Sequence, residues 1–302
     1  MALVVLCPGQ GGQHAGMFAL AAGSPDAAPV LDALRGATAL DPDALSAETP
    51  FHANALAQPL ICAAALAAWR ALRGSLPQPL CFAGYSVGEL AAYACADALG
   101  EADLMALAGS RAALMDAAAP GSGMAALLGL DDAEAERLAA RHGAAVAIYA
   151  GARHHIVGGP LPALDALEAA IPGERGAGLR RLAVGVASHT PWLDAAVAPL
   201  RALLEERLRD PRIPVLAGID GQPVRGRDRA AQTLARQLAE PIRWRDCVEA
   251  AVELGGRCFL ELPPGRALAN LLRESHPGLP ARAVDEFRTP QGVAAWVERA
   301  CG

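Results

Sequence analysis

Short apolar runs alternate with longer, alanine-rich stretches along most of this 302-residue chain. Buried strands that alternate with helices are typical of a mostly parallel sheet covered on both faces, so the expected fold class is α/β. The runs that predict strands are residues 3–6, 79–83, 213–217 and 258–262. The stretches that predict helices are residues 59–72, 87–96, 101–118, 191–209, 229–238, 242–253 and 266–274, with Pro59, Pro191 and Pro241 expected in first turns.

The middle of the chain has a different pattern. Gly121-Ser122-Gly123 interrupts the chain, and six short elements follow in the order βαββαβ, which is the ferredoxin-like arrangement. Their predicted ranges are 124–129, 131–141, 144–149, 155–157, 162–170 and 179–184. We therefore expect a small domain at residues 120–190, inserted into a larger α/β domain formed by residues 1–119 and 191–302.

Composition excludes several kinds of chemistry. All 26 basic residues are arginine, so a Schiff-base lysine, a phosphate-loop lysine and a Ser-Lys dyad are ruled out. The net charge of −6 and the lack of a basic run disfavour a nucleic-acid partner. Seven scattered cysteines without a CxxC pair predict reduced thiols and a cytoplasmic location.

Two apolar segments need a separate interpretation. Residues 1–8 lack a basic flank and predict a first buried strand, not a signal peptide. Residues 56–72 contain Trp69 and Arg70, which favours a core helix over a membrane span.

The motif with the clearest chemistry is Gly84-Tyr85-Ser86-Val87-Gly88, which fits GxSxG between a predicted strand and a predicted helix. Such a tight turn exposes the serine oxygen, and the flanking glycines let the chain close around it. The N–H of Val87 would then lie at a helix N-terminus, facing a developing oxyanion. Ser86 is therefore the candidate nucleophile. Glu89, in the first helical turn, is expected to have a structural role beside the helix dipole.

Spacing alone does not choose a base among the seven histidines. An α/β-hydrolase order favours a late one, His276, whereas His189 lies just before a predicted helix. The neighbours His154 and His155 would point to opposite faces of a strand, so we predict no metal site there. The glycine-rich loop at residues 7–13 lacks both the lysine and the spacing of a nucleotide-binding loop.

Taken in order, the motifs resemble one family over nearly the whole chain. The loop Pro8-Gly9-Gln10-Gly11-Gly12-Gln13 resembles the PGQGSQ opening of malonyl-CoA:acyl carrier protein transacylases, and Gly84–Glu89 resembles their GHSxGE. The other segments in the family order are Arg111, Met124-Ala125-Ala126, Ser188-His189, Gln237, Pro241, Trp244 and Glu261-Leu262-Pro263-Pro264-Gly265. The family fold is an α/β-hydrolase-like core with an inserted ferredoxin-like domain, as predicted above.

The resemblance also implies a role for each site residue. His189 would be the base, oriented by a main-chain carbonyl near Gln237 in place of an aspartate. Gln10 and Val87 would supply the backbone N–H groups of the oxyanion hole. Arg111 would bind the free carboxylate of a malonyl group through paired hydrogen bonds. Malonyl-CoA would be the substrate and an acyl carrier protein the partner, with no permanently bound cofactor and no metal.

Departures from the family pattern suggest a branch within it. Tyr85 replaces the usual histidine, an Asn-x-Pro stretch is missing around residues 150–153, and an asparagine is missing near residues 218–221. The elbow most resembles that of the malonate decarboxylase epsilon subunit, which implies other decarboxylase subunits as partners. The alternatives are a transacylase of fatty acid or polyketide synthesis, a serine thioesterase or hydrolase, and a catalytically inert docking subunit.

Overall fold

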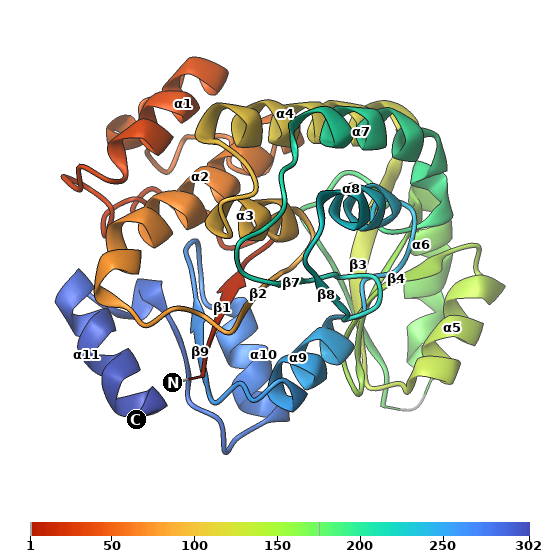
Figure 1. The fold of residues 1–302 in the computed structure, drawn as a ribbon. Coiled ribbons are helices and arrows are strands. Elements are labelled where there is room, and N and C mark those ends of the chain that lie inside the picture. The colour runs from red at the N-terminus through yellow and green to blue at the C-terminus, as the bar shows by residue number, and fades with distance from the viewer. Residues whose placement is uncertain (1, 175) are drawn as a thin grey trace.

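The computed structural model describes residues 2–174 and 176–302, and these form two β-sheets with helices around them (Figure 1). The strands are β1 (Leu3–Cys7), β2 (Cys81–Gly84), β3 (Ser122–Leu128), β4 (Ala145–Gly151), β5 (His154–Pro160), β6 (Gly178–Arg181), β7 (Val215–Leu216), β8 (Pro223–Val224), β9 (Cys258–Glu261) and β10 (Ala281–Ala283). The α-helices are α1 (Ala28–Thr38), α2 (Asn54–Leu72), α3 (Val87–Cys95), α4 (Glu101–Ala118), α5 (Asp132–Arg141), α6 (Leu161–Ala170), α7 (Asp194–Arg207), α8 (Arg227–Arg236), α9 (Trp244–Glu253), α10 (Ala267–Ser275) and α11 (Pro290–Cys301).

The larger sheet has the strand order β10-β9-β1-β2-β7-β8. Its first five strands are parallel, and only the edge strand β8 is antiparallel to its neighbour. Helices lie on both sides, with α2, α3 and α4 on one and α9 and α10 on the other (Figure 1). The predicted α/β class with a mainly parallel sheet is confirmed.

Alternate residues of the central strand β1 face opposite sides, as the strand period requires. Val5 and Cys7 belong to the core beneath α2 and α3, whereas Val4 and Leu6 belong to the core on the side of α9 and α10. All five residues of β1 are buried. Because both faces are covered, the strand is apolar throughout, which explains why a continuous run predicted it correctly.

Helix α2 begins at Asn54, five residues before the predicted start. Residues such as Ala57 and Gln58 are already buried, so the packed face continues past Pro59, which lies inside the helix and not in its first turn. Among the described residues, only this helix has the length and hydropathy of a membrane span, yet 83% of its apolar window is buried inside the protein. That burial agrees with the predicted core helix.

Other boundaries also differ from the prediction. Strand β7 is only two residues long, the segment from Pro191 opens with a 3-10 turn before α7, and α9 begins at Trp244, beyond Pro241. Each difference lies at the end of an element, where local propensity is weak and packing decides.

The second sheet is antiparallel and has the order β4-β5-β3-β6. With α5 and α6 it realises the predicted βαββαβ sequence of elements. On one face, sheet residues such as Val157 pack against α5 and α6, and α6 contributes Leu164 to this contact. On the other face, Met124 and Ile156 join the core shared with the larger sheet. The domain boundaries at residues 120 and 190 stay a prediction.

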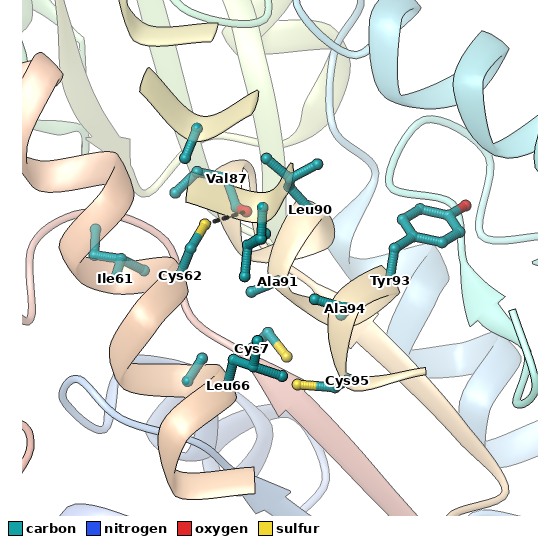
Figure 2. Close-up of a cluster of buried hydrophobic side chains, with 14 of the residues drawn as sticks. Cys7, Ile61, Cys62, Leu66, Val87, Leu90, Ala91, Tyr93, Ala94 and Cys95 are labelled. Carbon is teal, nitrogen blue, oxygen red and sulfur yellow. Dashed lines mark hydrogen bonds between the residues drawn. The ribbon is translucent and has the colours of Figure 1, made fainter. Parts of the chain in front are cut away.

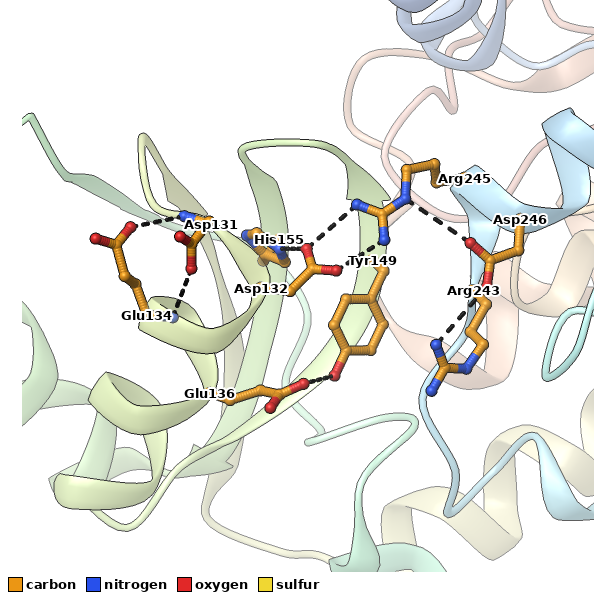
Figure 3. Close-up of polar contacts among 9 residues, drawn as sticks. All are labelled: Asp131, Asp132, Glu134, Glu136, Tyr149, His155, Arg243, Arg245 and Asp246. Carbon is orange, nitrogen blue, oxygen red and sulfur yellow. Dashed lines mark hydrogen bonds and ion pairs between the residues drawn. The ribbon is translucent and has the colours of Figure 1, made fainter.

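Backbone hydrogen bonds, together with the side-chain contacts drawn in Figure 3, join the second sheet and α5 to the segment at the start of α9. Tyr149 N–H donates to the carbonyl of Ile242 at 2.8 Å, and Ile242 N–H donates to that of Ala147 at 2.9 Å. Asp132 accepts two hydrogen bonds from Arg245, at 2.7 and 3.2 Å. The second sheet is therefore held against α9 at a defined position beside the larger sheet.

Asp132 gives this contact a testable pH dependence. Hydrogen bonds from Arg245 hold its pKa at about 2, despite partial burial. A folded pKa below the unfolded value of about 3.9 stabilises the fold above about pH 4, and this contribution is lost as pH falls toward 2. Asp132→Asn is expected to lower the free energy of unfolding by about 1 kcal/mol at pH 7, since the pair is partly exposed, and by progressively less below pH 4.

Urea unfolding between pH 7 and pH 3 measures this difference. Asp228→Asn, at a carboxylate whose side chain is 92% exposed, is the control and should have little effect at any pH. The free energy of unfolding could instead differ between Asp132→Asn and the unaltered protein by the same amount at every pH. That result would contradict the lowered pKa of Asp132 as the cause of the stabilisation.

Candidate active site

Ser86 lies between the end of β2 and the start of α3. Its backbone has φ 57° and ψ −120°, a strained combination for a residue with a side chain. The strain is enforced from both sides, because Tyr85 N–H donates to the carbonyl of Cys7 at 3.0 Å while α3 begins at Val87. The predicted sharp strand-to-helix turn is therefore present, with Ser86 at its tip.

The two glycines of the motif are required by close packing. A Cβ at Gly84 would lie 2.1 Å from the nitrogen of Glu89, and one at Gly88 would lie 2.2 Å from the carbonyl oxygen of Cys7. Both contacts are with backbone that cannot move away. Glycine at these positions lets α3 turn back directly over the ends of β1 and β2.

A tightly packed apolar layer between α2 and α3 supports helix α3 (Figure 2). Its residues Val87, Leu90 and Ala91 face α2, and the thiol of Cys62 on α2 lies 3.8 Å from the carbonyl oxygen of Val87. Burial raises the pKa of Cys62 to about 12, so it is a neutral packing group. This layer fixes the position of the helix N-terminus beside Ser86.

His189 reaches Ser86 from a different part of the chain. It follows the second sheet, has a positive φ of 62°, and is 1% exposed. Its Nε2 lies 2.7 Å from Ser86 Oγ, and its Nδ1 lies 2.6 Å from the carbonyl oxygen of Gln237. The backbone N–H of His189 donates to the carbonyl of Leu238 at 2.8 Å. The structure thus brings together Ser86, His189 and Gln237, and their catalytic roles stay a prediction.

The contact with Gln237 decides the tautomer of His189. A carbonyl oxygen can only accept, so Nδ1 carries the proton and Nε2 is free to accept from the serine hydroxyl. Gln237 caps the C-terminus of α8, where unpaired carbonyls and the helix dipole present negative partial charge. The C-terminus of α8 can therefore stabilise the imidazolium ion of His189, which is the role of the aspartate in a Ser-His-Asp triad.

The imidazole of His189 is neutral over a wide pH range. Burial, reinforced by the charge of Arg111, lowers its pKa to about 3, and the Gln237 carbonyl opposes this only in part. We expect kcat/KM for a thioester substrate to stay flat from pH 8 to pH 5, measured under conditions where the fold is intact.

Glu89 is a second group near Ser86 that could titrate in this pH range, and the variant Glu89→Gln distinguishes its effect on kcat/KM from that of His189. Burial raises the pKa of Glu89 to about 7. A fall near pH 6.5 that persists in Glu89→Gln would contradict the assignment to His189, whereas one that disappears would belong to Glu89.

Arg111 projects from α4 into the same site and is only 3% exposed. Its Nη2 donates to Ser86 Oγ at 3.4 Å and to Gln237 Oε1 at 3.2 Å, and its Nη1 donates to Gln58 Oε1 at 2.8 Å. A fourth contact is with the sulfur of Met115 at 3.1 Å. Burial lowers the pKa of Arg111 to about 10, so it stays charged at neutral pH.

All four of these partners are uncharged. Within residues 2–174 and 176–302, no carboxylate forms an ion pair with Arg111. A buried guanidinium with only neutral partners is costly, and an incoming anion would supply the missing charge. Gln58 and Met115 were not among the predicted site residues, because their role depends on where Arg111 points.

Ser86 and His189 lie at a cleft of about 600 Å³ between the two sheets. The glycine-rich loop contributes Gln10, and the second sheet contributes Met124 and Ile156. Arg180 and Arg266, which are both exposed, also line the cleft. Val87 is the first residue of α3, so its N–H is at the positive end of the helix dipole.

None of the other histidines considered from the sequence contacts Ser86. His276 contacts Ser275 and Glu249, at 2.9 and 3.2 Å, and does not line the cleft. His155 is buried against Asp132, whereas its neighbour His154 lines the cleft, so the two side chains point to opposite faces as predicted. The hydrolase order would therefore have selected a histidine that does not contact Ser86.

A strained serine, a neutral histidine oriented by a helix end, and a cleft between a parallel and an antiparallel sheet form an arrangement suited to acyl transfer through a serine ester. The chain matches the acyl transferase domain family over residues 4–284. It is 33% identical over 291 residues to the malonyl CoA-acyl carrier protein transacylase of Mycobacterium bovis, covering 93% of this chain and 96% of that protein. The chain belongs to this family of acyl transferases.

Two solved structures are similar throughout. The transacylase of Xanthomonas oryzae pv. oryzae has a TM-score of 0.91 at 29% identity, covering 99% of both chains. A malonyl-transacylase solved in complex with its type II polyketide synthase acyl carrier protein has a TM-score of 0.90 at 27% identity, covering 98% of this chain and 99% of that one. The expected family and fold are thereby confirmed.

Proposed function

We propose that this protein transfers a malonyl group from malonyl-CoA to the prosthetic-group thiol of an acyl carrier protein, through a malonyl ester on Ser86. The observation that carries the proposal is Arg111, a buried guanidinium 3.4 Å from Ser86 Oγ whose contacts are all with uncharged groups. A malonyl thioester places a carboxylate two carbons beyond the reacting carbonyl. Binding that carboxylate to Arg111 would bring the carbonyl to Ser86.

The first half-reaction forms the ester. His189 Nε2 takes the proton of Ser86 as Oγ attacks the malonyl carbonyl, and the backbone N–H groups of Gln10 and Val87 stabilise the oxyanion. The C–S bond then breaks, the thiolate of CoA takes the proton from His189 and leaves as the free thiol, and His189 is neutral again. The orienting carbonyl of Gln237 stabilises the imidazolium during this step.

The second half-reaction reverses the first with a different thiol. The carrier thiol gives its proton to His189 and attacks the malonyl ester, and Ser86 regains its proton as the C–O bond breaks. Both half-reactions need water to be kept from the ester. His189 is nearly fully buried, which favours transfer over hydrolysis.

Two branches of the family differ in the carrier that accepts the malonyl group. The elbow with Tyr85, which packs edge-on against Trp244 at 5.4 Å, motivates the malonate decarboxylase branch, whose carrier bears a phosphoribosyl-dephospho-CoA arm. The relatives compared above are transacylases, and one is bound to a polyketide carrier, which supports the fatty acid or polyketide alternative better. We place the reaction in the cytoplasm, in keeping with seven free cysteines.

Intact-mass spectrometry tests the transfer and the acceptor together. The protein is incubated with malonyl-CoA or acetyl-CoA, with Ser86→Ala as the control, and the purified adduct is offered to a phosphopantetheine carrier and to a decarboxylase-type carrier. A malonyl adduct that requires Ser86 and moves to one carrier supports the proposal and selects the branch. An adduct that water clears as fast as it forms indicates a hydrolase, and no adduct indicates an inert subunit.

A further inference from the structure

Glu89 is a fully buried carboxyl group that the proposed reaction does not use. It lies in the first turn of α3, three residues after Ser86, and is 0% exposed. Its Oε2 accepts from the N–H of Gly218 at 2.9 Å and from Nε2 of Gln237. Its Oε1 has no hydrogen-bond partner among the described residues. The carboxyl therefore reaches across the site toward α8 and does not remain at its own helix end.

Gln237 connects Glu89 to the rest of the site. Its side-chain nitrogen donates to Glu89, while its side-chain oxygen accepts from Arg111 Nη2 at 3.2 Å. An amide has one donating and one accepting end. If the amide turned over, its NH2 group would face the guanidinium, and two donors would oppose each other in a buried place.

We propose that Glu89 is a positioning residue for Arg111, the group that would bind the acyl carboxylate. Oε2 of Glu89 accepts from the Gln237 amide and so selects the amide orientation in which Oε1 of Gln237 holds Arg111 beside Ser86. This role rests on the proposed malonyl transfer, because it concerns how the acyl carboxylate is recognised. It works through the side chain of Gln237 and is separate from the backbone carbonyl that orients His189.

The role does not require Glu89 to be ionised. Its unpartnered Oε1 can carry a proton while Oε2 continues to accept from Gln237 and Gly218. Burial raises the pKa of Glu89 to about 7, Asp220 adds to this, and Arg111 opposes it. Tyr93 and Cys247, which also lie near the carboxyl, have pKa values raised by burial and are neutral. Glutamine, which keeps an acceptor oxygen and lacks the charge, should therefore replace Glu89 well.

The test measures the ratio of kcat/KM for malonyl-CoA to that for acetyl-CoA, which a general loss of folding would not change. Glu89→Ala leaves the amide of Gln237 without its acceptor, so the ratio is expected to fall by about ten-fold or more. Glu89→Gln should stay within about two-fold of the unaltered protein. Gln237→Leu, which keeps the backbone carbonyl, should lower the ratio about as much as Glu89→Ala, and the double variant should fall no further.

A matched control is Glu261→Ala. Glu261 is also a fully buried carboxyl, but its oxygens accept from the N–H groups of Leu268 and Ala269 at the start of α10 and contact neither Gln237 nor Arg111. This variant should lower the melting temperature and leave the ratio as it is.

Three outcomes overturn the role of Glu89: a ratio that survives Glu89→Ala, a Glu89→Gln variant as impaired as Glu89→Ala, or effects of Glu89→Ala and Gln237→Leu that add. Each of these can occur in a protein that prefers malonyl-CoA, and then the proposed function stands. An unaltered protein without a malonyl preference contradicts the proposed function and this role with it.

Discussion

Replacing His189 by alanine is expected to lower kcat for malonyl transfer by about 10³-fold to 10⁶-fold, because the nucleophile and its base act as a unit. Without the imidazole, nothing accepts the proton of Ser86 at 2.7 Å, and the leaving thiolate loses the imidazolium that would protonate it. The proposed oxyanion donors are backbone groups, and the proposed binding group for the acyl carboxylate is Arg111, so substrate binding should change far less than kcat.

Rapid-quench measurement of the malonyl-enzyme formation rate checks this expectation. His276→Ala is the matched control, since His276 is the histidine that a hydrolase-type chain order would select and it lies outside the cleft. A His276→Ala variant as slow as His189→Ala, or a His189→Ala variant within ten-fold of the unaltered rate, would contradict the assignment of the base.

The nucleophile turn could be predicted from sequence because its geometry is local. The strain at Ser86 arises from contacts within β2, α3 and the neighbouring end of β1, and the glycines at positions 84 and 88 are a direct consequence of those contacts. The alternation of apolar and helical stretches likewise predicted the parallel sheet and the βαββαβ order. Short-range rules were sufficient for both.

The rest of the site depends on packing between distant segments. His189 meets Ser86 only because the second sheet is fixed against α9, and the residues alone did not select it; the family resemblance did. Gln58 lies in an apolar helix that predicted only core packing, yet its side chain contacts Arg111. Glu89 was expected to interact with its helix dipole, but its carboxyl is bonded to Gly218 and Gln237.

Two very short strands and two peripheral helices were not predicted from the sequence. Strands β8 and β10 have two and three residues, too few to show alternation, and they add to the edges of a sheet that already exists. The helices α1 and α11 lie at the outside of the fold and were not assigned from the sequence. Their formation follows from the faces they bury in tertiary contacts, α1 against α2 and α4, and α11 against α2 and β9.

Replacing Arg111 by alanine is expected to lower kcat/KM for malonyl-CoA by about 10²-fold to 10³-fold and to leave acetyl-CoA transfer within a few-fold, so that the preference between the two is lost or reversed. The magnitude follows from the loss of a buried, charge-assisted pair with the acyl carboxylate. Arg111→Lys keeps the charge but not the paired hydrogen bonds, and it should be intermediate.

Competition between the two thioesters in one reaction measures this preference directly. Arg70→Ala is the control: Arg70 is also largely buried, but it is already paired with Asp97 and Glu101 at 2.7 and 3.1 Å, away from the cleft. Arg111 additionally lowers the pKa of His189, so Arg111→Ala should move the acid limb of the pH profile to higher pH. An unchanged preference with a shifted profile would mean that Arg111 tunes the base without binding the acyl group, and the substrate would then have to be sought among uncharged thioesters.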